Sequence, residues 1–369
     1  MSRFPFELAG PADDADLRHV LASTPMDGVI RVSFQREPSW FAAPGVDGRV
    51  CQIVACRDRD TGRIFGFGCR AIRDVFINGQ PGVVGYLSNL RVLPEYRNRG
   101  LVARGYAFFR QLHQDGLTPF YYTTIAAGNE TALAVLTAGR AGLPRYHSAG
   151  EFHTVAIALP WRSKADVPSG VTIRPAQEAD LPAVVEFLNT VGPRRQFFPR
   201  YTVADFAPGG ALQGLAPGDV LLAERAGKIV GTLAGWDQHA YRQRVVRGYG
   251  GWLGRLRPLY NAWAVLRGRA GLPAVGEPLR TLLAALPVVA DDDPVVFQAL
   301  LASLLQQASA AGWSHLLIGL HAADPLLAVA RRYEAACYTT QLYLVCWDDG
   351  DSARLALDGR PPYLESGSL

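Results

Sequence analysis

The chain has 369 residues, of which 49% are hydrophobic and 19% charged, and its formal net charge at pH 7 is +4. This length favours two domains over one. The small positive charge is too weak to indicate a nucleic-acid-binding protein, although it suits an anionic cofactor, and no apolar run reaches the ~18 residues of a membrane span.

The five cysteines are scattered and form no CxxC pair, and residues 1–5 do not resemble the start of a signal peptide. We therefore expect reduced, mostly buried thiols, a cytoplasmic protein and no metal site. No cysteine stands with a partner histidine in a way that marks a covalent nucleophile.

The first half of the chain predicts a strand-rich domain. Apolar patterning and turn residues predict strands over 50–56, 63–76, 83–92, 118–125 and 147–159. Helices are expected over 13–23, after residue 100 and from about Asn129. An antiparallel meander that passes into a βαβα unit is a mixed α/β fold.

Two internal matches predict that the second half repeats the first. Residues 10–17 (GPADDADL) are similar to 174–181 (RPAQEADL), and residues 62–66 (GRIFG) are similar to 227–231 (GKIVG), at nearly the same offset. The sequence therefore predicts two tandem domains, over 1–160 and 171–348. A linker over 161–170 joins them, and a C-terminal tail over 349–369 follows.

Residues 92–102 (VLPEYRNRGLV) form the most informative segment. A strand ends at a proline, a turn of basic residues and glycine follows, and an amphipathic helix begins. Unpaired N–H groups and the helix dipole suit such a turn to a pyrophosphate. Neither a P-loop nor a GxGxxG pattern is present.

This segment resembles the acyl-CoA loop of the GCN5-related N-acetyltransferases, the GNAT superfamily. The family pattern Arg/Gln-x-x-Gly-x-Gly/Ala is matched by Arg97 and Gly100, whereas Val102 departs from the small residue expected. The Val-x-Pro that precedes the loop in the family is present at 92–94. The resemblance covers most of residues 1–160 and implies two GNAT-like domains, each with a mostly antiparallel sheet.

The resemblance also implies the residues that would hold acetyl-CoA or another acyl-CoA. Backbone groups of Leu90 and Val92 would pair with the pantetheine arm as if it were an added strand. The diphosphate would be cradled by Arg97, Asn98, Arg99, Gly100, Leu101 and Val102. Asn129 begins an Asn-x-x-Ala sequence similar to one whose asparagine faces pantetheine in the family.

Transfer of an acyl group from a thioester to an amine needs a neutral amine, an oxyanion donor and a proton for the leaving thiolate. The tyrosine that often supplies this proton in the family is replaced by Leu136. Tyrosines that remain open for this role are Tyr146, Tyr121 and Tyr122. Side chains that remain open as base or amine-binding groups are Ser88, Asn89, Glu151 and His153, each of which is also explained by a purely structural role.

The second copy of the loop is predicted to be degenerate. Asp291, Asp292 and Asp293 stand where phosphate oxygens would lie, and like charges oppose anion binding. The same carboxylates suit the N-terminus of the helix that begins near Pro294. We therefore expect this half not to bind CoA in the usual way.

An insertion over 241–276 carries seven arginines and no acidic residue. Its large apolar residues repeat at helical spacing, with a fresh helix expected at Pro258. The pattern predicts either a helix that packs its apolar side on the domain or a docking surface for an anionic partner, such as a carrier protein, an acidic substrate or a lipid surface. Interleaved glycines and apolar residues make nucleic acid the less favoured partner.

The sequence thus predicts an acyl-CoA-dependent N-acyltransferase, acting by direct transfer to a small-molecule or peptide amine. A non-catalytic acyl-CoA sensor or scaffold and an interaction module based on the insertion are the alternatives. The acceptor is not marked: Trp40 and Phe41 suit either its pocket or the core. A homodimer is left open.

Overall fold

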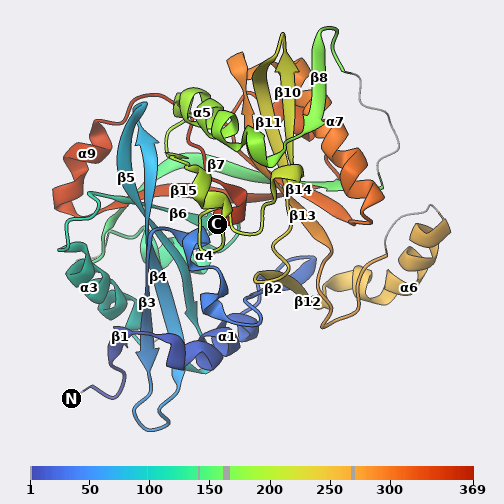
Figure 1. Ribbon diagram of the computed structural model, residues 1–369. Helices are drawn as coiled ribbons and strands as arrows, with labels where there is room; N and C mark the ends of the chain where they lie inside the picture. Colours follow the sequence, from blue (N-terminus) through green and yellow to red (C-terminus); the bar gives the residue numbers. More distant parts are fainter. Residues whose placement is uncertain (1, 98, 140–141, 161–166, 267–270) are drawn as a thin grey trace.

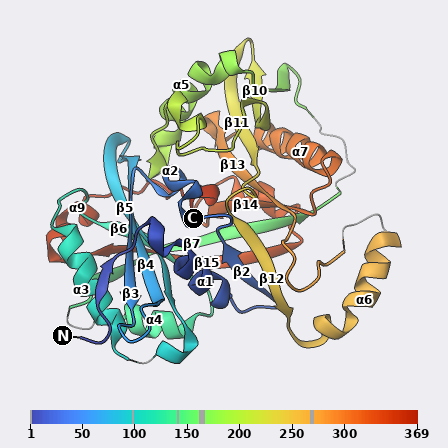
Figure 2. The ribbon, with the colours of Figure 1, turned by 60° about the horizontal axis from the view of Figure 1, so that its bottom comes forward.

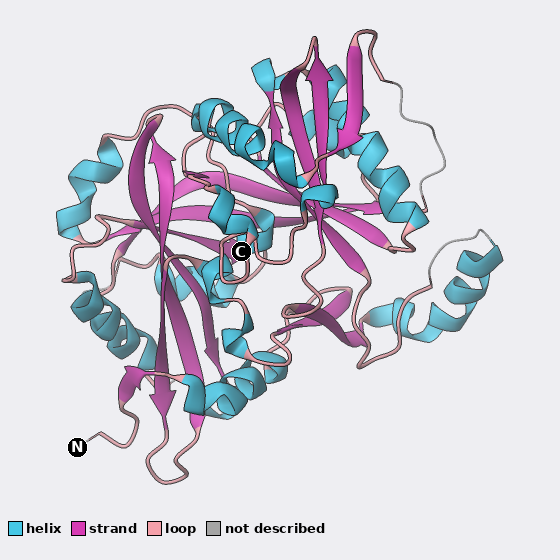
Figure 3. Cartoon of the chain, viewed as in Figure 1, coloured by secondary structure: helices cyan, strands magenta, loops and turns pink. Residues whose placement is uncertain are grey.

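The computed structural model describes residues 2–97, 99–139, 142–160, 167–266 and 271–369. In the described part, thirteen strands form one long mixed sheet and two more form a small separate sheet. Figure 3 shows the long sheet crossing the molecule with helices on both of its faces. Within the same residues, no helix is both long enough and apolar enough to span a bilayer.

The first half contains the strands and helices that the sequence predicts, with ends that differ by a few residues. Its strands are β1 (Phe6–Leu8), β2 (Ile30–Gln35), β3 (Val50–Arg57), β4 (Ile64–Ile77), β5 (Gln80–Val92), β6 (Tyr121–Ala126) and β7 (Arg145–Ala158). Its helices are α1 (Asp14–Ser23), α2 (Pro44–Asp47), α3 (Leu101–His113) and α4 (Glu130–Leu136).

The second half repeats this order of elements. Its strands are β8 (Val171–Pro175), β9 (Phe198–Pro199), β10 (Val220–Arg225), β11 (Lys228–Trp236), β12 (Gln243–Tyr249), β13 (Thr281–Val289), β14 (His315–His321) and β15 (Ala336–Cys346). Its helices are α5 (Leu181–Val191), α6 (Gly251–Leu266), α7 (Pro294–Ala310), α8 (Leu327–Arg331) and α9 (Asp351–Leu355). In each half a strand runs through a turn into a long helix and then into a parallel strand, β5-α3-β6 and β13-α7-β14.

The two halves exchange their last strands. The order in the long sheet is β1-β3-β4-β5-β6-β15-β7-β14-β13-β11-β10-β8. Strand β15 of the second half pairs with β6, and β7 of the first half pairs with β14. The predicted domain limits at 160 and 348 therefore do not separate two independent sheets. Each half of the long sheet includes a strand from the other half of the chain. Of the predicted linker, residues 161–166 lie outside the described residues.

Helix α3 packs on the sheet as its apolar pattern predicts. Leu101, Tyr106 and Phe109 are buried, whereas Phe108 is half-buried. Gly105 allows a close approach, since a Cβ at this position would lie 3.2 Å from the ring of Phe6 in β1. This contact fixes where the helix begins relative to the end of β5.

The C-terminal segment does not form the tail that the sequence predicts. Leu364 and Glu365 are 2% exposed, and the chain end lies between the two halves in Figures 1 and 2. Its backbone carbonyls hold it in place: that of Gly367 accepts a hydrogen bond from Gln238, and that of Ser368 accepts one from Arg73. Backbone anchoring leaves no periodic apolar pattern, so the segment resembles a tail in sequence.

The predicted insertion joins the halves as well. Strand β12 pairs antiparallel with β2, from Gln243 opposite Gln35 to Tyr249 opposite Ile30. Helix α6 then runs through Pro258 as one helix, so the fresh helix expected at this proline is wrong. In Figures 1 and 2 this helix projects from the body of the protein.

Candidate functional site

Strand β5 carries a bulge in its second half. The register with β4 shifts between Phe67 and Cys69, which places two residues of β5, Asn89 and Leu90, opposite one residue of β4. Asn89 accordingly has a φ of 52°. The bulge lies beside Ser88, whose hydroxyl accepts a hydrogen bond of 3.3 Å from the Asn89 amide.

A gap opens beside this bulge. Strands β5 and β6 are parallel, but they pair only at Gly85–Tyr121 and Tyr86–Tyr122, after which β6 continues alongside β15. Past the paired residues the two strands diverge. Leu90 is 46% exposed at this edge of β5, which is unusual for a leucine within a central strand.

The turn after β5 is packed against the protein at Tyr96 and exposed at Gly100. The ring of Tyr96 stacks on Phe65 at 3.9 Å, and its hydroxyl donates to Asp58 at 3.1 Å. Gly100 then takes a left-handed conformation, φ 66°, and a Cβ at this position would meet no atom within 4 Å. No side chain caps the first turn of α3, so its N–H groups face the open side of the turn.

The open turn is also electropositive. Arg97 and Arg99 are exposed, and within the described part of the chain neither has a carboxylate partner. Arg99 lies over the rings of Phe4 and Tyr96, at 5.5 and 5.4 Å. Leu101 and Val102 form the first helical turn, and Asn98 lies outside the described residues. Uncompensated guanidinium groups beside free helix N–H groups fit an anionic ligand.

Asn129 caps the next helix. Its side-chain oxygen accepts a hydrogen bond of 3.1 Å from the N–H of Ala132, and the residue is exposed at the start of α4. It follows the C-terminal end of β6, at the same edge as the gap. Leu136, which replaces the expected tyrosine, is the last residue of α4 and is buried in the core.

Tyr146 lies away from the gap. It pairs with Val345 of β15, which pairs with Tyr121 at the start of β6, where β5 and β6 are still joined. Its hydroxyl forms a hydrogen bond with that of Tyr106 inside the core. Burial, reinforced by Tyr106, raises the pKa of Tyr146 well above its usual value.

Of the other sequence candidates, Tyr121, Tyr122 and His153 are buried and have side-chain partners, whereas Glu151 is exposed. Tyr121 bonds to Arg70 at 2.9 Å, and the hydroxyl of Tyr122 accepts from Arg73. His153 contacts Thr339 at 3.2 Å and Glu151 at 3.4 Å, and burial is the main cause that lowers its pKa. None of these contacts involves the bulge.

Two side chains that the sequence analysis did not single out, Tyr338 and Arg91, come from the strands on either side of the gap. Tyr338 of β15 precedes by two residues Thr340, which pairs with Ala126 at the end of β6. Because the two strands are antiparallel, Tyr338 lies past the last residue of β6. It is 40% exposed and interacts electrostatically with Arg91, which follows the bulge in β5. Burial raises the pKa of Tyr338 despite the opposing effect of Arg91, so the phenol keeps its proton at neutral pH. No local pattern could have found it, because β15 belongs to the other half.

The second half contains the same bulge and the same turn before a long helix, but here both have hydrogen-bond partners within the chain. Leu286 has a φ of 53° at a bulge in β13, and its N–H donates to the carboxylate of Glu365 at 3.2 Å. Asp293 caps α7 by accepting from Val295 and Val296 at 2.9 and 3.3 Å. Both groups that could hold an acyl donor already have partners within the chain.

An arginine occupies the space between the turn and the following strand in this half. Arg195 donates to Asp292 at 2.7 Å and to Asp324 at 2.9 Å, and its side chain is 11% exposed. Asp324 is the counterpart of Asn129. A small pocket remains beside this network, lined in part by Arg194, Pro287 and Tyr363.

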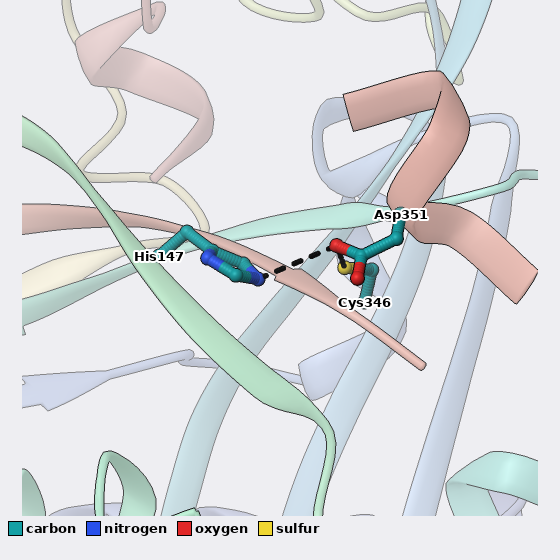
Figure 4. Close-up of side chains that lie close together, drawn as sticks. All are labelled: His147, Cys346 and Asp351. Carbon is teal, nitrogen blue, oxygen red and sulfur yellow. Dashed lines mark hydrogen bonds and ion pairs between the residues drawn. The ribbon is translucent and has the colours of Figure 1, made fainter. Parts of the chain in front are cut away.

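One cluster has a donor set that a metal ion could use. Figure 4 shows His147, Cys346 and Asp351 converging, with 3.6 Å from a carboxylate oxygen of Asp351 to both the histidine nitrogen and the cysteine sulfur. Arg145 and Arg354 also donate to this carboxylate, at 2.8 and 3.0 Å, and supply the positive charge. Burial, with Asp351, raises the pKa of the Cys346 thiol to about 11. We therefore assign the cluster to holding α9 on the sheet.

No family model matches the sequence, and no curated protein matches it. The structure is similar to that of a GCN5-related N-acetyltransferase from Sphaerobacter thermophilus, at 15% identity and a TM-score of 0.57, over 100% of this chain and 99% of that one. It is also similar to Saccharomyces cerevisiae N-myristoyltransferase with bound myristoyl-CoA, at 12% identity and a TM-score of 0.57, over 94% and 83% of the two chains. At these identities the likeness concerns the fold. The chain therefore has the fold of the GCN5-related N-acetyltransferases, built twice along one polypeptide.

Proposed function

We propose that the protein is an acyl-CoA-dependent N-acyltransferase whose donor site lies in the first half. One observation carries this proposal: Arg97 and Arg99 directly precede an uncapped helix N-terminus and have no carboxylate partner in the described chain, whereas the matching position of the second half is filled by its own ion pairs. The similar N-myristoyltransferase structure, which contains myristoyl-CoA, supports a CoA thioester as the donor.

The donor would lie along the gap. Leu90 and Val92 would flank the pantetheine arm, which takes the place of a strand beside β5. The diphosphate would rest on the turn from Arg97 through Asn98 and Gly100 to Val102, at the positive end of the α3 dipole. Asn129, at the opposite edge of the gap, would face the same arm.

The chemistry would take place at the bulge. The nitrogen of a neutral amine attacks the thioester carbonyl carbon, the C–N bond forms, and the C–S bond breaks to release a CoA thiolate. In this proposal, the backbone N–H groups at Asn89 and Leu90 would bind the carbonyl oxygen as its negative charge grows. The amine loses one proton and the thiolate gains one.

Tyr338 is our candidate for the group that protonates the thiolate. It is the exposed phenol at the gap, and its raised pKa keeps it protonated. Tyr146, the sequence candidate, is engaged with Tyr106 in the core. Ser88 and Asn89 stay candidates for orienting the amine from the other side of the bulge.

Two measurements test the function. Calorimetric titration with CoA should show binding by the full chain and binding weakened about tenfold or more in Gly100→Asp, at a position where an added Cβ would meet no atom within 4 Å. Release of free thiol from acetyl-CoA and longer acyl-CoAs, in the presence of small amines and of peptides, should then depend on the amine. Binding without amine-dependent thiol release would identify a sensor instead, and absence of CoA binding would refute the proposal.

A further inference from the structure

Helix α6 presents a stripe of large apolar side chains to solvent. Its members are between 37% and 86% exposed: Leu256, Leu259, Tyr260, Trp263 and Leu266. Their spacing of i, i+3, i+4, i+7 and i+10 places them within an arc of about 120° on the helix surface. Leu253 and Ala264, which lie outside this arc, are buried and attach the helix to the protein.

Exposed large apolar side chains are concentrated in this stripe. Fifteen large apolar side chains are exposed in the described part of the chain, and five of them belong to these eleven residues. Single exposed leucines are ordinary on soluble proteins, whereas contiguous apolar patches mark interaction sites. The alternative expected from the sequence, a helix that packs its apolar side on the domain, does not describe this stripe.

The sequence of α6 and of the segment after it carries charge of a single sign, although Arg267 and Arg269 lie outside the described residues. Every charged residue from 251 to 276 is an arginine: Arg255, Arg257, Arg267 and Arg269. Arg255 flanks the stripe, is exposed, and has no carboxylate partner among the described residues. Arg257, on the other side of the helix, donates to the carbonyl of Leu272 at 3.2 Å.

We propose that α6 is a docking surface for an anionic phospholipid bilayer, with the helix lying flat among the headgroups. Leucines enter the acyl region, whereas tryptophan and tyrosine favour the interface, where one end of the ring is wet. Arginines beside them pair with lipid phosphates and anionic headgroups. The projection of α6 from the body lets this face meet a membrane without a spanning segment (Figures 1 and 2).

Two other occupants fit the surface less well. A second copy of the chain, docked through the same face, would bring the arginines of two helices together, and like charges would oppose the contact. A specific acidic protein needs polar groups that fix its register, and the stripe itself consists of leucine, tyrosine and tryptophan.

The test is flotation of the full chain with phosphatidylcholine vesicles, with and without phosphatidylserine. The wild-type chain should float with the anionic vesicles and lose this binding as salt is raised. Leu259→Ser with Leu266→Ser should lower the partition coefficient at least tenfold, since two inserted side chains are lost. Arg255→Glu should lower it about fivefold or more, since each arginine contributes roughly a factor of five.

Matched controls separate docking from general surface effects. Leu355→Ser removes a leucine that is 70% exposed on α9, and Arg59→Glu reverses an exposed charge in a distant turn; both should float like the wild type. Failure of the wild type to float with anionic vesicles, or unchanged flotation of the double-serine variant, overturns the proposal. So does a dimer that this variant dissociates, or tighter binding to polyglutamate than to the vesicles.

Discussion

Asn89 in the first half and Leu286 in the second occupy the same place in their sheets, each at a bulge and with a φ of 52° and 53°. Each is followed by a turn and a long helix. In the second half the Leu286 N–H donates to Glu365 and the helix is capped by Asp293. In the first half the helix has no side-chain cap. The same backbone arrangement therefore has partners within the chain in the second half, whereas the first half leaves the N-terminus of its helix without a side-chain cap.

The difference lies in where the compensating charges come from. Arg195 is neutralised by Asp292 and Asp324 inside the chain, so nothing further is needed there. Arg97 and Arg99 have no such partner among the described residues, and a phosphate group would complete them. In our proposal the first half keeps a ligand site at this place, where the second half has an internal ion-pair network.

The largest effect is expected from Arg195→Leu, which leaves the buried Asp324 without its cation and Asp292 with only Arg194, at 3.7 Å. Loss of one partner of a buried ion pair costs about 3–5 kcal/mol. Urea denaturation should show this loss in the free energy of unfolding, whereas Arg97→Leu should change it by less than about 0.5 kcal/mol. Equal effects of the two changes would contradict the comparison.

Reversal of both loop charges, Arg97→Glu with Arg99→Glu, should weaken CoA binding about 100-fold, since two attractive contacts with phosphate become repulsive. The dissociation constant from calorimetry measures this. Arg225→Glu, in the second half, is the matched control and should leave CoA affinity unchanged. If Arg225→Glu alone lowered CoA affinity, the donor site would lie in the second half.

Gly100→Asp should weaken CoA binding about tenfold or more, because it places a carboxylate where the second half has Asp293. Aspartate tolerates a positive φ better than most residues, so the fold should persist with a cost of about 1 kcal/mol. We therefore expect a melting temperature close to that of the wild type together with a lower affinity for CoA. Retained affinity would remove the turn from the site.

Tyr338→Phe should lower kcat by about tenfold, because the leaving thiolate loses its proton donor. Since the pKa of Tyr338 is raised, wild-type kcat should begin to fall only above the usual tyrosine pKa, and this alkaline limb should vanish in the variant. Tyr146→Phe is the control and should change stability more than kcat. The reverse pattern would return the proton-donor role to Tyr146.

The sequence predicts the local elements of this fold well, because apolar spacing and turn residues act over a few positions. The turns at 92–102 and 291–293 are both local, and the sequence predicts the helix that follows each of them. The exchange of β7 and β15 could not, since an alternating strand fits either sheet and its pattern does not name a partner. Tyr338 was missed for the same reason. The burial of Glu365 depends on backbone contacts that leave no pattern at all.

The exchanged strands also set the order in which this chain can mature. Strand β6 pairs with β5 on one side, but its neighbour on the other side comes only from residues 336–346, more than two hundred positions later. During synthesis the first half must therefore wait with an exposed strand edge until almost the whole polypeptide has left the ribosome, and such edges invite intermolecular pairing. Nascent chains stalled before residue 336 should need chaperone protection that the finished protein does not.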